Sequence, residues 1–298
     1  MDIRHLKYFL GVLDHGGFGR AAEALHVAQP SLSQAVQALE RELGVQLFHR
    51  TGRTVVVSAS GQALIEPARR TVRDLDVFRS TADALKGKEA GQVDLALLPS
   101  QSIEPFCSIA VRFGQLYPGM MISAQPAYTG ADVMRLISSG KCELGLFGSA
   151  SFLPPAGIHL EPVEEQAMVL IGLPGQPFTD GSVVDRHELS GQRFITSQTG
   201  SVMRRVVDEI LASGVDASIA VEVAHRAAVL PLVLAGGGVA VLAAAWTDFA
   251  RQSGAAVMRL EPAHTLKVTL AYRTPASLTP AAQAFADVVR EYVSDKYR

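Results

Sequence analysis

Short polar side chains gather at the start of one helical segment near the N-terminus. The amides and hydroxyls are carried by Gln29, Ser31, Ser33, Gln34 and Gln37, and Pro30 lies among them. Groups of this kind donate and accept the hydrogen bonds that base edges and phosphates offer. Pro30 could contact a thymine methyl group in the major groove. The chemistry these residue types favour is therefore recognition of nucleic acid.

Two short helices must position these side chains. Residues 20–25 put Ala21, Ala22 and Leu25 on one face. The second pattern, residues 30–43, puts Leu32, Val36, Leu39 and Leu43 on one face; Pro30 suits its first turn and Gly44 its end. This spacing fits a helix-turn-helix, whose second helix enters the major groove. It fits an ordinary helical hairpin with a polar outer face equally well.

Further residues around the two helices resemble the LysR-type transcriptional regulators. They are Ala21-Ala22, Leu25, Gln29-Pro30-Ser31, Leu39-Glu40, Leu43-Gly44, Leu47-Phe48, Arg50 and Arg53. The resemblance covers about the first sixty residues densely and the rest of the chain loosely. It implies a winged helix-turn-helix with a wing at about residues 45–57, in which Arg50 and Arg53 meet the DNA backbone and minor groove. One departure is Gly19, where the family usually has a helix-capping Ser or Thr; glycine there costs a few tenths of a kcal/mol.

Composition and charge limit the class of protein. The chain has 298 residues, 48% of them hydrophobic, which suits two or three soluble domains. Its net charge is −2, and residues 1–58 hold six Lys and Arg against five Asp and Glu, so DNA affinity must come from where cations lie and from paired copies. No signal peptide and no membrane span is visible, and we expect a cytoplasmic protein. We expect no metal, because no histidines pair at ligand spacing, and no cofactor.

A long helix follows the predicted wing. Ser58 can cap a helix over residues 59–85, and apolar or small residues recur along it with heptad spacing: Leu64, Ala68, Thr71, Leu75, Phe78, Ala82 and Leu85. Such a seam favours burial against a partner, although the helix could pack on its own domain instead. The resemblance implies an antiparallel dimer helix that holds two DNA-reading heads on a dyad. Pro67 should kink this helix.

Beyond residue 91, strands and helices alternate. Strands are predicted at 93–98, 121–127 and 144–147, and helices at 102–117 and 132–139; this indicates a parallel sheet covered by helices. A second set comprises strands at 167–173, 194–196, 218–224, 239–242 and 266–273 and helices at 202–212, 226–235 and 280–297. The resemblance implies a two-subdomain effector-binding domain like periplasmic solute-binding proteins, with crossings near residues 161–166 and 264–268.

The predicted fold class is therefore α+β multidomain, in three parts. Residues 1–58 form the winged helix-turn-helix, residues 59–88 the dimerisation helix, and residues 91–298 the α/β effector domain. Within the last, subdomain I takes about 91–161 and 268–298, and subdomain II about 162–267.

Ligands of open α/β sheets bind at the carboxyl ends of strands, against helix N-termini. The candidate effector-binding residues at those places are Ser100, Gln101, Ser102, Thr129, Gly130, Phe147, Thr199, Gly200, Ser201 and His225. Ser100 and Thr129 match positions that bind effector carboxylates in related proteins. The set favours a small carboxylate, although each Ser or Thr alone could be a plain helix cap. His225 and Arg226 could add positive charge, but Arg226 could also point to solvent.

Other classes of function have less support. Neither a nucleophile elbow nor a phosphate-binding loop nor a His-Glu-x-x-His helix occurs, so no enzyme and no catalytic residue is expected. A solute-binding protein would share the C-terminal fold but not the DNA-binding head. A thiol sensor would use Cys107 or Cys142; the peroxide-sensing branch carries its pair in the second half, and buried structural thiols are the preferred interpretation.

The predicted function is a sequence-specific transcriptional regulator, activator or repressor, that responds to a small-molecule effector. The expected partners are double-stranded DNA with an interrupted dyad, RNA polymerase and other copies of the chain in a homodimer or homotetramer. No membrane partner is expected.

Overall fold

The computed structural model describes residues 1–51, 54–86, 90–150, 153–175 and 178–298. The chain divides into two compact units, the first built on Met1–Lys88 and the second holding nearly all of the remainder. Each unit is described by itself. No helix among the described residues is long and apolar enough to cross a membrane.

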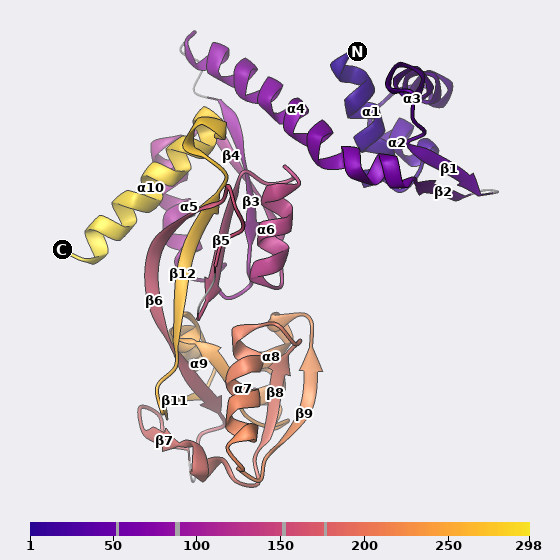
Figure 1. Cartoon of the computed structure of the whole chain (residues 1–298). Helices are drawn as coiled ribbons and strands as arrows, with labels where there is room; N and C mark the ends of the chain where they lie inside the picture. The colour runs from indigo at the N-terminus through magenta and orange to yellow at the C-terminus, as the bar shows by residue number, and fades with distance from the viewer. Residues whose placement is uncertain (52–53, 87–89, 151–152, 176–177) are drawn as a thin grey trace. The chain divides into compact units, whose positions relative to one another are not determined.

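Three helices and a two-stranded hairpin form the N-terminal head (Figure 1). They are α1 (Ile3–Asp14), α2 (Phe18–Ala24), α3 (Gln29–Leu43), β1 (Phe48–Thr51) and β2 (Thr54–Val57), with β1 antiparallel to β2. Leu32, Val36 and Leu39 are buried against Phe9 and Leu47. The two predicted helices and the wing are confirmed.

Two details of the head differ from the prediction. Leu43, predicted on the apolar face, is 39% exposed at the end of α3, and Gly44 ends the helix in a left-handed conformation (φ 69°). The N-cap of α2 is Gly17, so Gly19 lies within the first turn and caps nothing. The absent Ser or Thr at Gly19 therefore removes no capping hydrogen bond.

The long helix α4 (Ala59–Ala84) begins where the sequence predicts. The Ser58 hydroxyl accepts a hydrogen bond from Gly61 N at 2.9 Å and so caps the helix. Gly61 is required there because an added Cβ would lie 2.2 Å from Leu47 O. Pro67 lies inside the helix, and the kink at that residue stays a prediction.

The heptad seam of α4 divides into two parts. Ala68 is buried in the core of the head and Leu64 packs beside it, so this part of the seam packs on its own unit. Further along, Phe78 is 72% exposed and Leu85 is 85% exposed. Within the described chain, only the second part of the seam presents large apolar side chains to a further partner.

In the second unit, the first half follows the predicted βαβ order. Its elements are β3 (Gly91–Leu97), α5 (Phe106–Leu116), β4 (Met120–Pro126), α6 (Gly130–Ser138) and β5 (Leu144–Ser149). Strands β4, β3 and β5 are adjacent and parallel, as predicted. Helix α5 begins four residues later than predicted, since proline disfavours a helical residue before it and Pro105 forms the N-cap.

Two long strands connect the halves (Figure 1). Strand β6 (His159–Gly172) pairs antiparallel with β12 (Thr265–Tyr272). With β7 (Val183–Asp185) and β11 (Ala256–Glu261), the sheet order runs β4-β3-β5-β12-β6-β11-β7. The crossings predicted at 161–166 and 264–268 lie on these paired strands. The sequence predicted β6 only from residue 167, because Glu161, Glu164 and Glu165 interrupt its apolar pattern.

The second half is less regular than the sequence predicted. Its strands are β7 (Val183–Asp185), β8 (Arg193–Ser197), β9 (Ser218–Val223), β10 (Ala240–Ala243) and β11 (Ala256–Glu261); its helices are α7 (Val202–Ala212), α8 (Val229–Leu234) and α9 (Thr247–Gln252). Single-turn helices lie at η1 (Arg186–Leu189), η2 (Arg226–Ala228) and η3 (Ala244–Trp246). Here β10 and β11 are antiparallel to β6, while β8 and β9 form a separate parallel pair. The prediction missed β7, β11 and α9, which are short or interrupted by polar residues.

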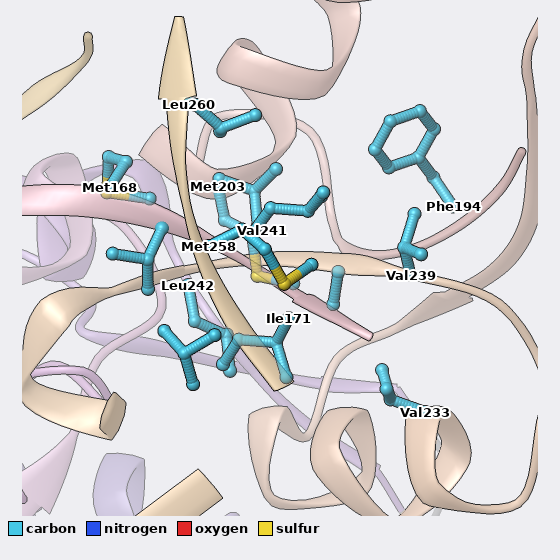
Figure 2. Packing of buried hydrophobic residues seen from close by; sticks show 14 of the residues in the cluster. Met168, Ile171, Phe194, Met203, Val233, Val239, Val241, Leu242, Met258 and Leu260 are labelled. Atoms are coloured by element: carbon cyan, nitrogen blue, oxygen red, sulfur yellow. The ribbon is translucent and has the colours of Figure 1, made fainter. Parts of the chain in front are cut away.

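The core of this half joins β6, β10 and β11 to α7 (Figure 2). Ile171, Val241 and Met258 are at most 1% exposed and lie at its centre. The chain ends with η4 (Pro275–Ser277) and α10 (Pro280–Lys296), which packs against β3 and α5. Thr279 caps α10 and also donates its hydroxyl to Glu143 at 3.0 Å.

Candidate effector cavity and DNA-reading surface

The first turns of α3 present the predicted DNA-binding side chains on the surface. Gln29, Pro30, Ser31 and Gln34 are exposed, and Ser33 is half-buried. They surround the helix start, while Leu32 and Val36 fix its opposite side in the core. The arrangement holds four polar groups outward on a rigid helix.

The wing is anchored to the same helix. Glu40 Oε1 accepts hydrogen bonds from Leu47 N at 2.7 Å and Phe48 N at 3.2 Å. Arg50 lies on β1, opposite Val55 in the register, and its side chain is outside the described part of the structure. Arg53 lies outside the described residues altogether.

In the second unit, a cavity of about 560 Å³ lies where the loops after β3, β4 and β5 face the start of α7 and the η2 turn. Seven of the ten predicted effector residues line it: Ser100, Gln101, Thr129, Gly130, Thr199, Gly200 and Ser201. Large apolar side chains complete the wall: Leu98, Met168, Met203, Leu242 and Leu266. A cavity with an apolar wall and few convergent polar groups is the usual form of a small-molecule site.

Arg226 supplies the buried charge of this cavity; the two other charged residues that line it, Arg205 and Asp208, are exposed. Arg226 follows β9, is 6% exposed and donates from Nη1 to the Ser100 hydroxyl oxygen. No carboxylate of the described residues pairs with it, and burial lowers its pKa to about 10, so it stays cationic at neutral pH. The suggestion that it points to solvent is wrong. Its position shortly after the carboxyl end of β9 could be predicted from the sequence, whereas its burial could not.

Gln101 is a second buried polar residue of the cavity. It is 0% exposed, lines the cavity, and neither its Nε2 nor its Oε1 has a hydrogen-bond partner among the described residues. Gly148 makes room for it, since a Cβ there would lie 2.8 Å from Gln101 Nε2. A buried amide with both groups unsatisfied costs free energy unless a ligand completes it.

The hydroxyls of Thr129 and Ser201, by contrast, are already used within the protein. Thr129 Oγ1 donates to Asp132 Oδ2 at 3.0 Å and accepts from Asp132 N at 3.1 Å. Ser201 Oγ lies 2.5 Å from Ser197 Oγ and accepts from Arg204 N at 3.1 Å. Both act as helix caps. Among the buried polar side chains that line the cavity, the groups left for a ligand are those of Arg226, Gln101 and the Ser100 O–H.

Three predicted effector residues do not line the cavity. The Ser102 hydroxyl donates to Pro99 O at 2.6 Å and does not begin a helix, because α5 begins at Phe106. Phe147 is 0% exposed in an apolar cluster with Val133, because alternate residues of a strand face opposite sides. His225 is exposed, with its ring 6.5 Å from that of Tyr128.

The two cysteines differ in environment. Cys142 is buried, as predicted, but the prediction that Cys107 is buried is wrong. Cys107 lies on the outer face of α5, and its Sγ donates to Ser102 O at 3.2 Å.

The fold and the two sites define a class: a DNA-reading head joined by a long helix to a ligand-binding α/β domain. The family model described as "Bacterial regulatory helix-turn-helix protein, lysR family" matches residues 3–62, and the one described as "LysR substrate binding domain" matches residues 86–294. The chain belongs to the LysR family, and it is a DNA-binding transcriptional regulator with an effector-binding domain.

Relatives of known name match over almost the whole length. The hydrogen peroxide-inducible genes activator of Pectobacterium carotovorum subsp. carotovorum is 25% identical over 98% of this chain and 97% of its own. A full-length OxyR variant from Pseudomonas aeruginosa has a TM-score of 0.75 at 22% identity, covering 98% of this chain and 94% of its own. Full-length CbnR complexed with its target DNA has a TM-score of 0.69 at 23% identity, covering 98% and 100%. At these identities the two structures show the fold alone.

Proposed function

We propose that this regulator senses a small carboxylate bound in the cavity beside Arg226. The observation that carries the proposal is a buried, cationic guanidinium whose one protein partner among the described residues is a neutral hydroxyl. A buried charge without a counter-charge is costly, and an anionic ligand would offset that cost. Gln101 and the Ser100 O–H supply further hydrogen bonds beside it.

We place DNA recognition on α3 and the wing. Gln29, Ser31, Ser33 and Gln34 would contact base edges in the major groove, with Pro30 against a thymine methyl. Arg50 and Arg53 would bind the backbone or the minor groove. The exposure of the α3 residues and the anchoring of the wing by Glu40 support this placement. Full-length CbnR has been solved on its target DNA, which supports the same role for the present fold.

The assembly we propose is a homodimer through the open part of the α4 seam, with two dimers joining as a homotetramer. Two heads on a two-fold axis would read an interrupted dyad. A ligand shifts such an assembly only if it binds two quaternary states with different affinities. The outcome would be a change in DNA bending and in access of RNA polymerase, as activation or repression. We assign the chain no enzymatic activity and place it in the cytoplasm, with the DNA it reads.

A carboxylate panel tests the proposed sensor function. Full-length protein is heated with small aliphatic and aromatic carboxylates, and ligands of the native state raise the melting temperature by mass action. At a hundredfold excess over Kd the expected stabilisation is about 2.7 kcal/mol. Hits should disappear in Arg226→Met, which keeps a long apolar side chain but removes the charge.

The matched control is Arg259→Met, an exposed arginine on β11 that does not line the cavity. It should keep every hit. Carboxylates that stabilise Arg226→Met as strongly as the natural protein would contradict the site, and a panel without any hit would contradict the ligand class.

A further inference from the structure

The side-chain amide of Gln101 carries information about the ligand beyond its negative charge. A carboxylate can accept hydrogen bonds from Arg226, from the Ser100 O–H and from Gln101 Nε2. It cannot satisfy Gln101 Oε1, which needs a donor. This holds whichever way the amide is turned, because one of its two ends is always an acceptor. Both ends of the Gln101 amide are buried and unpartnered among the described residues. A carboxylate alone would therefore leave the amide oxygen without a hydrogen bond, which costs free energy.

The missing donor must lie close to the anionic group. Ser100 and Gln101 are consecutive residues, and Arg226 is hydrogen-bonded to the first of them. Because Arg226 and Gln101 line the same cavity, we place the neighbouring carbons of a carboxylate bound to Arg226 beside the Gln101 amide. An O–H or N–H on one of those carbons would complete the site.

The charges around the cavity favour a hydroxyl over an ammonium group as the hydrogen-bond donor of the ligand. Among the described residues lining the cavity, Asp208 is the one carboxylate, and its Oδ1 already accepts from Arg204 Nε at 2.8 Å. An ammonium group would lie near the Arg226 guanidinium without a free acid to balance it, and like charges repel strongly in a buried site. A neutral hydroxyl has no such cost.

One side of the cavity wall is apolar. Met168, Met203 and Leu242 line the cavity and also belong to the buried core of this half, where Figure 2 labels them. Leu98 and Leu266 complete this side, and each is at most 4% exposed. These side chains suit a hydrocarbon or aromatic body rather than a second charged end.

We infer that the effector is a hydroxycarboxylate with an apolar body, its hydroxyl near the carboxylate and donating to Gln101. The inference rests on the proposed carboxylate-sensing function and names the ligand class within it. Gln101 acts here as the residue that determines specificity, while Arg226 provides the charge.

Matched pairs of ligands separate the two roles. Salicylate is compared with benzoate, mandelate with phenylacetate, and 2-hydroxy-4-methylpentanoate with both 4-methylpentanoate and leucine, by titration calorimetry on the full chain. In at least one pair the hydroxy acid should bind roughly tenfold more tightly than its partner without the hydroxyl. Leucine should bind more weakly than the corresponding hydroxy acid.

The Gln101→Leu variant has a side chain of similar volume and should reduce the affinity ratio between acids with and without the hydroxyl to about one, while simple acids still bind. If the leucine variant unfolds at low temperature, Gln101→Met replaces it. Arg226→Met should abolish binding of both members of a pair. Equal affinity for acids with and without the hydroxyl, or a ratio unchanged in both Gln101 variants, would overturn the hydroxycarboxylate inference and leave the carboxylate function standing. Absence of binding by every acid would overturn the carboxylate function itself.

Discussion

At the scale of single residues, two of the hydroxyls predicted from the sequence are less available to a ligand than the buried arginine and glutamine of the cavity. Thr129 and Ser201 are both candidate effector ligands in the sequence, yet their hydroxyls cap α6 and α7. Arg226 and Gln101 make fewer contacts within the protein and so have more to offer a ligand. A ligand gains most binding free energy from buried groups whose hydrogen bonds or charge are not compensated in the free protein.

Removing the charge of Arg226 should therefore stabilise the ligand-free protein. Burial lowers the pKa of Arg226 to about 10, which corresponds to a cost of the order of 3 kcal/mol for keeping it charged at neutral pH. Loss of the hydrogen bond to Ser100 offsets about 1 kcal/mol of the gain. Arg226→Met should raise the midpoint of chemical unfolding without ligand, and a lowered midpoint would show that the guanidinium is satisfied in the free protein.

The sequence gives the location of this site better than its chemistry. Strand ends followed by Ser100, Thr129 and Ser201 predicted where the cavity lies, because polar residues after strands mark loop positions whatever their later contacts. Burial of Arg226 depends on how η2 packs against the loop after β3, residues that are 126 positions apart in the chain. No local pattern contains that information.

At the scale of elements, α3 and the wing should contribute differently to DNA binding. Gln29→Ala should relax the preference for one base; the free energy of DNA binding should fall by about 1–3 kcal/mol on the best site and by less on others. Arg50→Ala should weaken binding to all sequences and reduce the slope of log affinity against log salt concentration by about one. Fluorescence titrations over matched operators and salt concentrations measure both. A loss from Gln29→Ala that is equal on every sequence would contradict base recognition.

The crossing strand β6 is held to α10 by an ion pair that should respond to acid. Glu161 accepts from Tyr272 Oη and, at 2.9 Å, from Arg290 Nη2. Burial of the Glu161 carboxyl opposes ionisation, but Arg290 and Tyr272 outweigh it and hold its pKa below the ordinary value. Because the folded pKa is the lower one, this stabilisation is complete above the unfolded pKa of about 4.3 and is lost as pH falls through the folded value.

The Glu161→Gln variant tests this acid response. It should cost about 1 kcal/mol at neutral pH, since the pair is partly exposed, and its unfolding free energy should fall less steeply than that of the natural protein between about pH 5 and 3. Parallel curves for the two proteins would show that Glu161 does not contribute.

At the scale of the whole molecule, the assembly we propose uses the half of α4 that the core of the head leaves exposed. The heptad pattern continues past Ala68, but the core of the head does not, so Phe78 and Leu85 remain exposed. An apolar stripe of this kind on a helix favours pairing with a second copy. The pattern alone could not show where packing on the head ends and the free seam begins, because both use the same spacing.

Placing a charge on the free seam should separate the subunits. Phe78→Glu removes a side chain whose burial is worth about 1.5–3 kcal/mol and sets two carboxylates into the interface, so the dimer dissociation constant should rise by tenfold or more. Sedimentation equilibrium measures this constant, and Gln62→Glu adds the same charge at an exposed position near the other end of the helix as a control. The separated heads should also lose affinity for a two-half-site operator far more than for a single half-site, because pairing makes the second contact intramolecular. A Phe78→Glu protein that stays dimeric would move the subunit interface away from α4.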